Sequence, residues 1–385
     1  MSLADASQTV AEEDGLLAFR PDAALDMFEE MLRRALADLP SGAGSWREVW
    51  TVLCELDALG APQPAFAGGL GPMAAGIVAR QLGRSGQATP FVLSAAAIAP
   101  ALAEVAARAG KGAETGAPHG TSPSELAARC AALSESLARG DQIATLARRP
   151  DGRSCGTAPP PPPEWDGATL NGDRALVPFA PDADCVLVPA TAVAGTVLLA
   201  LPARSLPPPQ RRYATIDGSP AADYRFSALP VPAAALLAEG PAAERLLARM
   251  VELETLGMAA EMLGALQAMT DMTREHLTQR HQFGRPLSAN QALRHRFADM
   301  IIALSRADSL VQAATAAPAD AGRRGVALQQ ARGVLLSVAR LVSQDALQMQ
   351  GAGGMALSSP FSRLFRRVTA LRLWMGEGPA AGPGT

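Results

Sequence analysis

The 40 residues from Ala242 to His281 contain no proline, and this uninterrupted run constrains the fold more than any other feature of the sequence. Leu253, Leu256 and Leu263 recur within it at the spacing of one helical face, so the run predicts one long amphipathic helix. Three further helical segments follow, at residues 290–316, 325–349 and 360–374. Four long helices with short connections predict an antiparallel bundle at the C-terminal end of the chain.

The first 140 residues also show the periodicity of helices, but in shorter pieces. The capped apolar segments run from Asp22 to Leu36, from Ser45 to Leu59, from Gly71 to Gly83 and from Ser122 to Leu137. Pro90 and Pro100 predict a break or a kink between the last two segments.

Between residues 142 and 235 the pattern changes to short β-prone runs separated by turn signals, among them Asn171-Gly172 and Asp217-Gly218. The β-prone runs extend from Ile143 to Ala147, from Cys185 to Val188 and from Thr196 to Leu201. The predicted class is therefore α+β and mostly α. It has an N-terminal helical domain over residues 1–140, a small middle β-barrel domain over residues 141–235 and a C-terminal antiparallel four-helix bundle over residues 236–385.

Composition limits the function classes. With 48% hydrophobic residues the chain can bury a core, and a net charge of -3 offers no broad basic surface, so we expect no nucleic-acid partner. The four cysteines are scattered without metal-ligand spacing and the four histidines are not grouped, so we expect free thiols and no metal site. The N-terminus lacks the pattern of a signal peptide, and no uninterrupted apolar run of about 18 residues suggests a membrane span. These features predict a soluble, cytoplasmic protein.

Two sequence blocks in the C-terminal part carry the strongest functional signal. The first is Thr278–Leu287 (TQRHQFGRPL), which continues into Asn290–Met300 (NQALRHRFADM). The second is Gln348–Gly354 (QMQGAGG), which continues through Ser359-Pro360 and Leu364–Arg367 (LFRR). Together with their spacing and the order of helices, β domain and helices, the two blocks closely resemble the signature of the acyl-CoA dehydrogenases.

The resemblance implies an FAD-dependent oxidoreductase of fatty acid metabolism and lipid degradation. It would oxidise the bond between the α and β carbons of an acyl-CoA and use an electron-transfer flavoprotein as electron acceptor. A flavin dinucleotide needs cations and amide donors on a rigid scaffold. By resemblance, the residues that would contact the FAD of a neighbouring subunit are Arg280, Gln282, Phe283, Gln291, Gln348, Gly351 and Ala352. A site shared in this way implies a homodimer or a homotetramer.

Taken singly, these residues have simpler interpretations. Arg280 alone could be an ordinary surface arginine, and Phe283 alone could be a core residue. The glycines from Gly351 to Gly354 alone are typical of a helix C-cap followed by a turn. The functional interpretation depends on the two blocks occurring together.

The catalytic base of such an enzyme must be a carboxylate that can reach the α-proton of the substrate. Most family members carry a glutamate just after the last bundle helix, and here that position falls on Met375, with Glu377 two residues later. A few members, isovaleryl-CoA dehydrogenase among them, place the base on the first bundle helix. Counting back from Arg280, Glu254 falls on that position.

Glu254 is therefore the predicted base, and a solvated helix residue is the alternative interpretation. Glu261, two turns further along, shares its face and is a second candidate. The arginine that often follows the base in the family is replaced by Thr255.

The chain also departs from the family pattern in the middle domain and at its end. Thr145–Pro150 and Leu176–Pro178 stand where typical members carry the segments that hold the flavin ring, without the residues expected there. The shortened end resembles bacterial dehydrogenases that pair an active subunit with a degenerate one. One alternative function is therefore a non-catalytic structural subunit that completes a partner's FAD site in a heteromer. Another is a helical interaction protein that binds no flavin.

Overall fold

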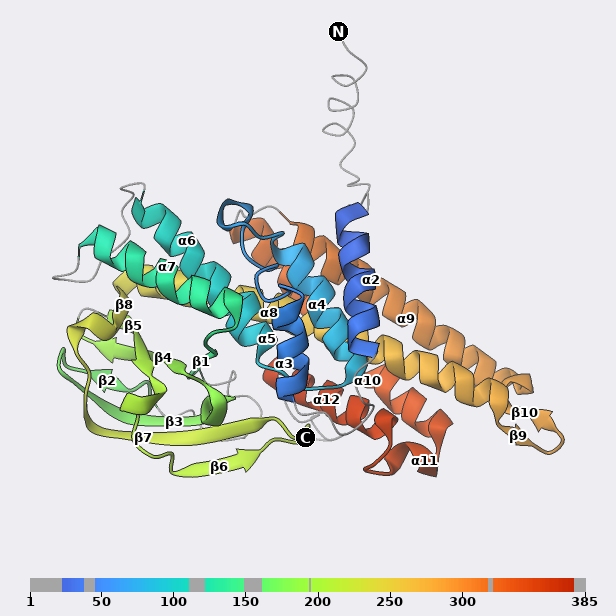
Figure 1. The fold of residues 1–385 in the computed structure, drawn as a ribbon. Helices are drawn as coiled ribbons and strands as arrows, with labels where there is room; N and C mark the ends of the chain where they lie inside the picture. Colours follow the sequence, from blue (N-terminus) through green and yellow to red (C-terminus); the bar gives the residue numbers. More distant parts are fainter. Residues whose placement is uncertain are drawn as a thin grey trace, which may run out of the picture.

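Helices, a sheet and a second set of helices follow one another along the chain (Figure 1). The computed structural model describes residues 23–37, 46–110, 122–148, 161–193, 195–317 and 321–376. The prediction of a mostly helical α+β protein is confirmed at this level.

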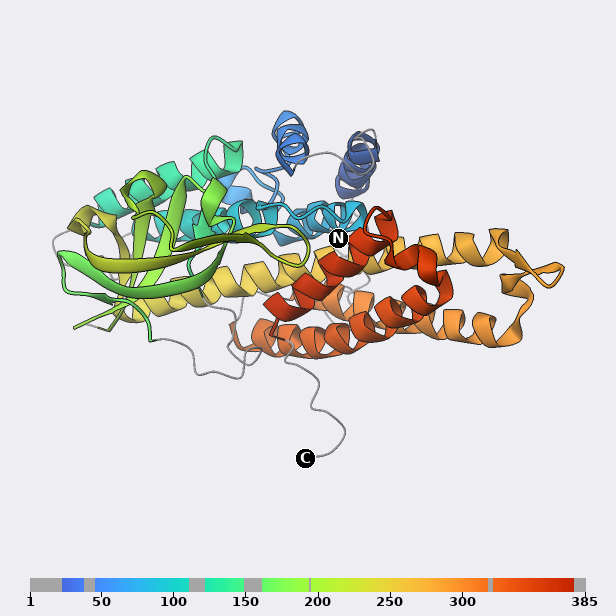
Figure 2. The same ribbon diagram turned by 90° about the horizontal axis from the view of Figure 1, so that it is seen from below.

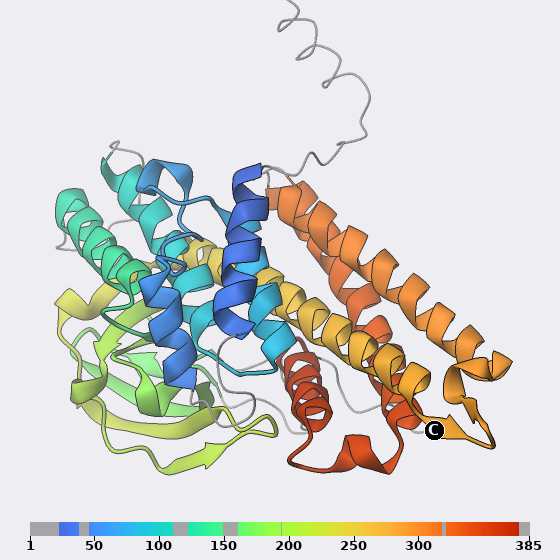
Figure 3. The same cartoon turned by 45° about the vertical axis from the view of Figure 1, so that its right-hand side comes forward.

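The predicted N-terminal segments match α2 (Ala23–Ala37), α3 (Trp46–Glu55), α4 (Pro72–Ser85) and α7 (Pro123–Arg139) to within a few residues, except that α3 is shorter than predicted. The helices α5 (Phe91–Leu93) and α6 (Ala99–Gly110) lie between the last two segments, where the sequence predicts only a break or a kink. A capping box starts α7, because the Ser122 hydroxyl accepts a hydrogen bond from the Glu125 N–H while the Glu125 carboxylate accepts one from the Ser122 N–H. Figure 3 shows α2 lying against α4, on the outside of the molecule.

The two prolines between α4 and α7 act differently from one another. Pro90 precedes α5 and marks a helix start, as predicted. Pro100 lies inside a helical run that continues from Phe91 to Gly110 through a π-helical turn, Ser94–Ile98. A wider turn displaces the carbonyl with which a proline ring would clash, so the helix passes Pro100 without ending.

This run includes the segment Phe91–Ala109, which is long and apolar enough to cross a membrane by composition alone. However, 72% of its most apolar window is buried inside the protein, as in the core helix of a globular fold.

Over the described residues, the middle sheet contains eight strands. They are β1 (Ala144–Leu146), β2 (Glu164–Trp165), β3 (Thr169–Pro178), β4 (Cys185–Ala192), β5 (Gly195–Pro202), β6 (Arg211–Ala214), β7 (Pro220–Pro230) and β8 (Leu236–Glu239). The order is β6-β7-β3-β2-β4-β5-β8, with β1 paired in parallel to β4. No pairing joins β6 to β8 among the described strands, so a closed barrel stays a prediction. Because β8 pairs with β5, the sheet continues to Glu239, past the predicted boundary at residue 235.

One of the two predicted hairpin turns is present and the other is not. Asp217-Gly218 turns the chain between β6 and β7, and Gly218 has the positive φ of 86° that favours glycine. Asn171-Gly172 lies inside β3 at a register irregularity against β7. There the Asn171 side chain accepts a hydrogen bond from the Ala228 N–H, and an added Cβ at Gly172 would lie 2.8 Å from Pro163 Cα. The pair therefore forms a β-bulge rather than a turn.

The C-terminal part is organised around one helix, α8 (Gly240–Gln279). A two-stranded hairpin of β9 (His281–Gln282) and β10 (Arg285–Pro286) follows it, and then α9 (Gln291–Ala316), α10 (Ala321–Gln350), α11 (Ala352–Met355) and α12 (Pro360–Trp374). These helices occupy the four segments that the sequence predicts. Figure 2 shows α9 and α10 along one side of α8, opposite the N-terminal helices, while α12 crosses α8 and contacts both α8 and α4.

The closest packing in the core is between α4 and α8. An added Cβ at Gly83 would lie 1.9 Å from the Glu261 carbonyl oxygen, and one at Gly264 would lie 1.9 Å from the Arg80 carbonyl oxygen. The two backbones therefore touch where glycines face each other, and this contact fixes the position of the middle of α8.

Candidate functional site

A small cavity of about 50 Å³ lies where the sheet, the N-terminal helices and the C-terminal helices meet. Both carboxylates that the sequence singles out on α8, Glu254 and Glu261, line it. The other lining residues come from α5 and its start, from β3 and β7 and the segments beside them, and from α8 and α12: Thr89, Val92, Leu93, Pro178, Phe179, Ser219, Met258, Arg367, Leu371 and Trp374. We call this the junction cavity.

Glu254, the predicted base, does not face bulk solvent. Its side chain is 12% exposed, and its Oε2 accepts a hydrogen bond from Arg148 Nη2 at 2.9 Å. Arg148 follows β1, so this ion pair joins the sheet to α8. The interpretation of Glu254 as a solvated helix residue is therefore wrong.

Glu261 belongs to a buried ion network that the sequence does not reveal directly. Arg367 on α12 donates from Nε to Glu261 Oε1 at 2.6 Å and from Nη1 to Asp217 Oδ2 at 2.6 Å. All three side chains are less than 10% exposed. Asp217 sits in the turn between β6 and β7, so the network ties the sheet to both helices.

Burial and pairing act in opposite directions on these groups. Burial raises the pKa of Glu261, and Arg367 offsets only part of that rise. Burial alone would also raise the pKa of Asp217, but Arg367 and the hydroxyls of Thr215 and Ser219 outweigh it and hold that pKa below its usual value. Asp217 is therefore the firmly ionised carboxylate of the network.

The two segments that the resemblance places at the flavin ring lie side by side. The Thr145 hydroxyl on β1 donates to the Pro178 carbonyl at the end of β3, and Thr145 is fully buried. Pro178 and its neighbour Phe179 line the junction cavity. The place expected for the ring is thus next to Glu254, even though the residues expected there are different.

The first predicted cofactor block lies far from this cavity, at the end of α8. Arg280, Gln282, Phe283 and Gln291 are all exposed, and Arg280 makes no ion pair with any described residue. Phe283 is 100% exposed and has a positive φ of 52°, which is costly for a bulky residue. A strained backbone at a non-glycine residue points to a functional role, so Phe283 is a candidate for a contact with another molecule.

The second predicted block is also exposed. Gln348 lies on the outer face of α10, Gly351 is the turn residue between α10 and α11, and Ala352 is the first residue of α11. Gly351 has a φ of 64°, and an added Cβ there would meet no atom within 4 Å. The contacts between elements join α11 to α10 and α12, and none of the principal contacts joins it to the β9–β10 hairpin.

Within one chain, Glu254 and the first block do not form one site. Arg280 follows Glu254 by 26 residues of almost continuous helix, which at about 1.5 Å per residue separates them by about 40 Å. Met375, the more usual position of the base, is a buried residue whose carbonyl accepts from Arg332 Nε at 2.7 Å. Glu377 lies outside the described residues.

A larger cavity, of about 390 Å³, lies in the N-terminal domain and shares no lining residue with the junction cavity. We place the candidate site at the junction cavity because the predicted base and the buried charges converge there. Among the described residues, no group of three metal-ligating side chains is placed to hold an ion.

Comparisons with known proteins give a consistent result. The sequence model of the acyl-CoA dehydrogenase C-terminal domain matches residues 245–378. An acyl-CoA dehydrogenase of Bacillus subtilis is 29% identical over 163 residues, which are 41% of this chain and 42% of the relative. The acyl-CoA dehydrogenase IpdE2 of Mycobacterium tuberculosis is 33% identical over 100 residues, which are 26% of this chain and 27% of the relative. The matched segments therefore span less than half the length of these relatives.

Solved structures resemble the chain over almost its whole length. A chain of the ChsE4-ChsE5 complex from Mycobacterium tuberculosis has a TM-score of 0.77 at 22% identity, covering 94% of this chain and 95% of that one. Butyryl-CoA dehydrogenase from Megasphaera elsdenii has a TM-score of 0.74 at 19% identity, covering 93% and 96%. At these identities the likeness shows the fold, and the sequence matches carry the relationship.

Proposed function

The chain belongs to the acyl-CoA dehydrogenase family, and from that premise we propose that it is an FAD-dependent acyl-CoA dehydrogenase with Glu254 as its base. One observation carries the proposal. Glu254 lines the cavity at the junction of the sheet and the helices, beside the two segments expected at a flavin ring. A carboxylate there is in the right neighbourhood to take the α-proton of a thioester.

Glu254 and Arg148 would have different roles in the reaction. Glu254 would remove the α-proton, after its carboxylate leaves Arg148 or shares it with the substrate. Arg148 would hold the carboxylate in position before the substrate arrives. A bound flavin would supply the acceptor for the hydride from the β-carbon.

The exposed residues fit a flavin dinucleotide held between subunits. Arg280 offers a cation with no ion-pair partner among the described residues, and Gln282 and Gln348 offer amide groups to a polar ligand. Gly351 presents bare backbone that a ligand can approach closely. An assembly of two or more chains would complete each site, with an electron-transfer flavoprotein as the proposed electron acceptor.

The test is the visible spectrum of the purified protein. We expect flavin absorbance that bleaches when a suitable acyl-CoA is added. Glu254→Gln should slow the bleaching about 100-fold or more, because it removes the base, and should leave the flavin bound. The matched control is Glu244→Gln, which removes a carboxylate from an exposed position near the start of α8. Bleaching by Glu254→Gln at the wild-type rate would remove the assignment.

A second function has an observation of its own in its favour. Both carboxylates of the junction cavity are already paired with arginines, and about 50 Å³ is far below the roughly 300 Å³ of ordinary ligand pockets. These features suit a structural subunit that completes the FAD site of a different dehydrogenase chain. A protein that is colourless by itself and acquires flavin only in complex with a second dehydrogenase chain would support this function. In that complex, Glu254→Gln would leave the activity unchanged.

A further inference from the structure

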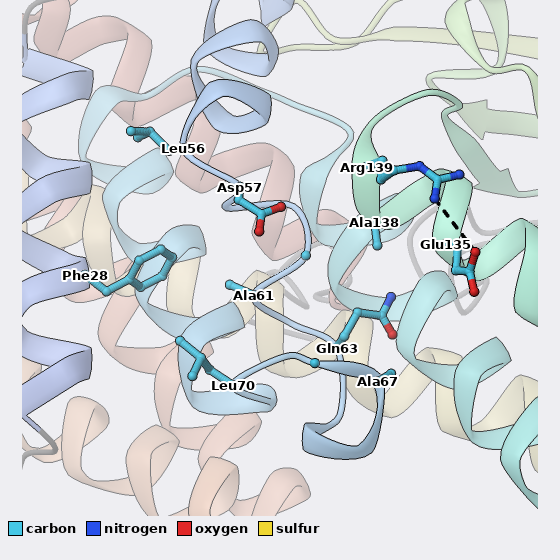
Figure 4. Close-up of a pocket in the computed structure, with 12 residues that line it drawn as sticks. Phe28, Leu56, Asp57, Ala61, Gln63, Ala67, Leu70, Glu135, Ala138 and Arg139 are labelled. Atoms are coloured by element: carbon cyan, nitrogen blue, oxygen red, sulfur yellow. Dashed lines mark ion pairs between the residues drawn. The ribbon is translucent and has the colours of Figure 1, made fainter.

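The large cavity of the N-terminal domain is the feature that the proposed function does not use. It lies between α2, the loop that joins α3 to α4, and the end of α7 (Figure 4). Its volume of about 390 Å³ falls within the range of roughly 300 to 1,000 Å³ that is typical of small-molecule sites. We call it the N-terminal cavity.

A tightly closed loop positions one buried amide in the wall of this cavity. The Gln63 carbonyl accepts a hydrogen bond from the Gly71 N–H at 2.9 Å, and the Ala61 carbonyl accepts one from the Leu70 N–H at 2.9 Å. Gly69 packs so closely on Gln63 that an added Cβ would lie 2.0 Å from the Gln63 carbonyl oxygen. The loop is therefore fixed by its own backbone, and the Gln63 side chain is fixed with it.

The Gln63 amide lacks the partner that a buried polar group requires. Gln63 is only 4% exposed, and its Nε2 has no hydrogen-bond partner. The nearest hydroxyl, on Ser134, gives its proton to the Ala99 carbonyl at 2.7 Å and lies 3.5 Å from Gln63 Oε1. Figure 4 shows the amide nitrogen pointing toward Ala138, on the side where the cavity lies. An orphaned amide in a cavity wall indicates a polar ligand atom that accepts its hydrogen bond.

The charges around the cavity favour a cation. Asp57 forms no ion pair with a described residue. Glu135 Oε2 lies 3.8 Å from Arg139 Nη1, while Arg139 Nε donates a hydrogen bond to Asp141 Oδ2 at 2.9 Å. Asp57, Glu135 and Arg139 line the cavity, and the shorter contact of Arg139 is with Asp141, which is not a lining residue, so the lining carries one net negative charge.

The opposite wall is apolar. Phe28 on α2, Leu56 at the end of α3 and Leu70 from the loop line it, and Leu70 is 53% exposed. Figure 4 shows Phe28 and Leu70 on one side of the cavity and Glu135 and Arg139 on the other. A ligand that satisfies both walls carries an apolar body and a charged end.

We propose that the N-terminal cavity binds a small amphipathic ammonium compound that carries an oxygen acceptor beside its ammonium group. The ammonium group lies between Asp57 and Glu135, the oxygen accepts from Gln63 Nε2, and the apolar body packs on Phe28 and Leu70. The site is independent of the flavin and of the acyl-CoA substrate.

The probe is L-leucinamide, which combines an ammonium group, an amide oxygen and a branched apolar body. Isothermal titration calorimetry on the full chain should show saturable binding of one molecule per chain with a Kd below about 1 mM. Isocaproamide lacks only the ammonium group and isoamylamine lacks only the amide. Each should bind at least about tenfold more weakly, because each loses a hydrogen bond to a charged or buried partner.

Two variants locate the binding. Asp57→Asn removes one charge and keeps the backbone, because asparagine tolerates the left-handed conformation that Asp57 adopts at φ 53°. Ala67→Trp fills the cavity from an exposed position and spares the core. Each should weaken leucinamide binding at least about tenfold. Glu48→Gln, an equal loss of charge on α3 outside the cavity, should bind like the wild type.

Absence of saturable heat up to about 10 mM leucinamide would overturn the proposal. So would wild-type affinity in a folded Ala67→Trp variant. Flavin absorbance should be the same with and without leucinamide, which keeps this result separate from that of the proposed dehydrogenase.

Discussion

Arg367 connects residues that come from three different parts of the chain. Its guanidinium is 6% exposed and bonds both Glu261 and Asp217, so neither carboxylate is left as an isolated buried charge. Removing one partner from such a group is costly because the remaining charge keeps its desolvation penalty. The junction of sheet and helices therefore depends on ionised groups as well as on apolar packing.

This network makes a prediction about pH. Because the pKa of Asp217 lies below its usual value in the fold, its ionised carboxylate stabilises the protein above about pH 3.9, the unfolded value. That contribution is lost as the pH falls through the lowered folded pKa. Asp217→Asn should therefore lower the melting temperature at pH 7, and the difference from the wild type should shrink as the pH falls below about 3.9. Calorimetric melting curves measured across this range would contradict the prediction if the difference stayed constant.

The sequence predicts the members of the site unequally. Glu254 can be identified by counting back from Arg280 along the predicted helix. Glu261 can be identified because it shares a helical face with Glu254. Arg367 was quoted as part of a motif, but nothing local to it names Glu261 or Asp217 as partners, since these are 106 and 150 residues away. A signal did exist: Arg367 lies next to Val368, and apart from Ser362 the other buried residues of its helix are apolar. A charge in such a stripe indicates a buried counter-charge.

At the level of elements, the contact between α4 and α8 gives a sharp test. Gly264→Ala would place a methyl group against the Arg80 carbonyl oxygen, which is backbone and cannot rotate away. We expect a loss of stability of about 1–3 kcal/mol or more, as for other overpacked cores. Gly333→Ala is the matched control, since Gly333 is an exposed residue within α10 with no atom within 4 Å of the added Cβ. That change should stabilise the protein by about 0.5–1 kcal/mol.

Thermal unfolding of the two variants side by side would decide this point. If Gly264→Ala is as stable as Gly333→Ala, the helices do not touch as described.

Helices and strands are predictable from the sequence where local periodicity alone determines them. They are not predictable where the packing of a distant segment of the chain decides the outcome. The long helices follow from periodicity and from the positions of proline. Asn171-Gly172 predicts a turn, but an Asn-Gly pair suits a β-bulge equally well. Only the pairing of β3 with β7 distinguishes the two structures. The predicted break at Pro100 is absent because the π-helical turn Ser94–Ile98, just before it, relieves the clash.

At the scale of the whole molecule, the exposed hairpin predicts self-association. Phe283 is fully exposed and has a strained positive φ. It lies in the β9–β10 hairpin, which extends from the end of α8 (Figure 1). We expect Phe283→Ser to weaken or abolish the oligomer without lowering the melting temperature of the protomer, because the side chain contributes nothing to the protomer's own core. Val193→Ser, at an equally exposed position between β4 and β5, should leave the assembly intact.

Light scattering after gel filtration measures both variants. A monomeric wild-type protein, or a Phe283→Ser variant that assembles normally, would contradict the expectation.

The length of α8 has a consequence for inheritance. The single helix α8 carries the proposed base, Glu254, near its middle and is followed directly by the exposed Arg280. While the helix stays intact, these two residues of one chain cannot contact the same ligand. In the proposed shared assembly, a defect at the tip of this helix would therefore harm the site of the neighbouring chain and spare the site of the chain that bears it. Two differently damaged copies could in this way repair each other.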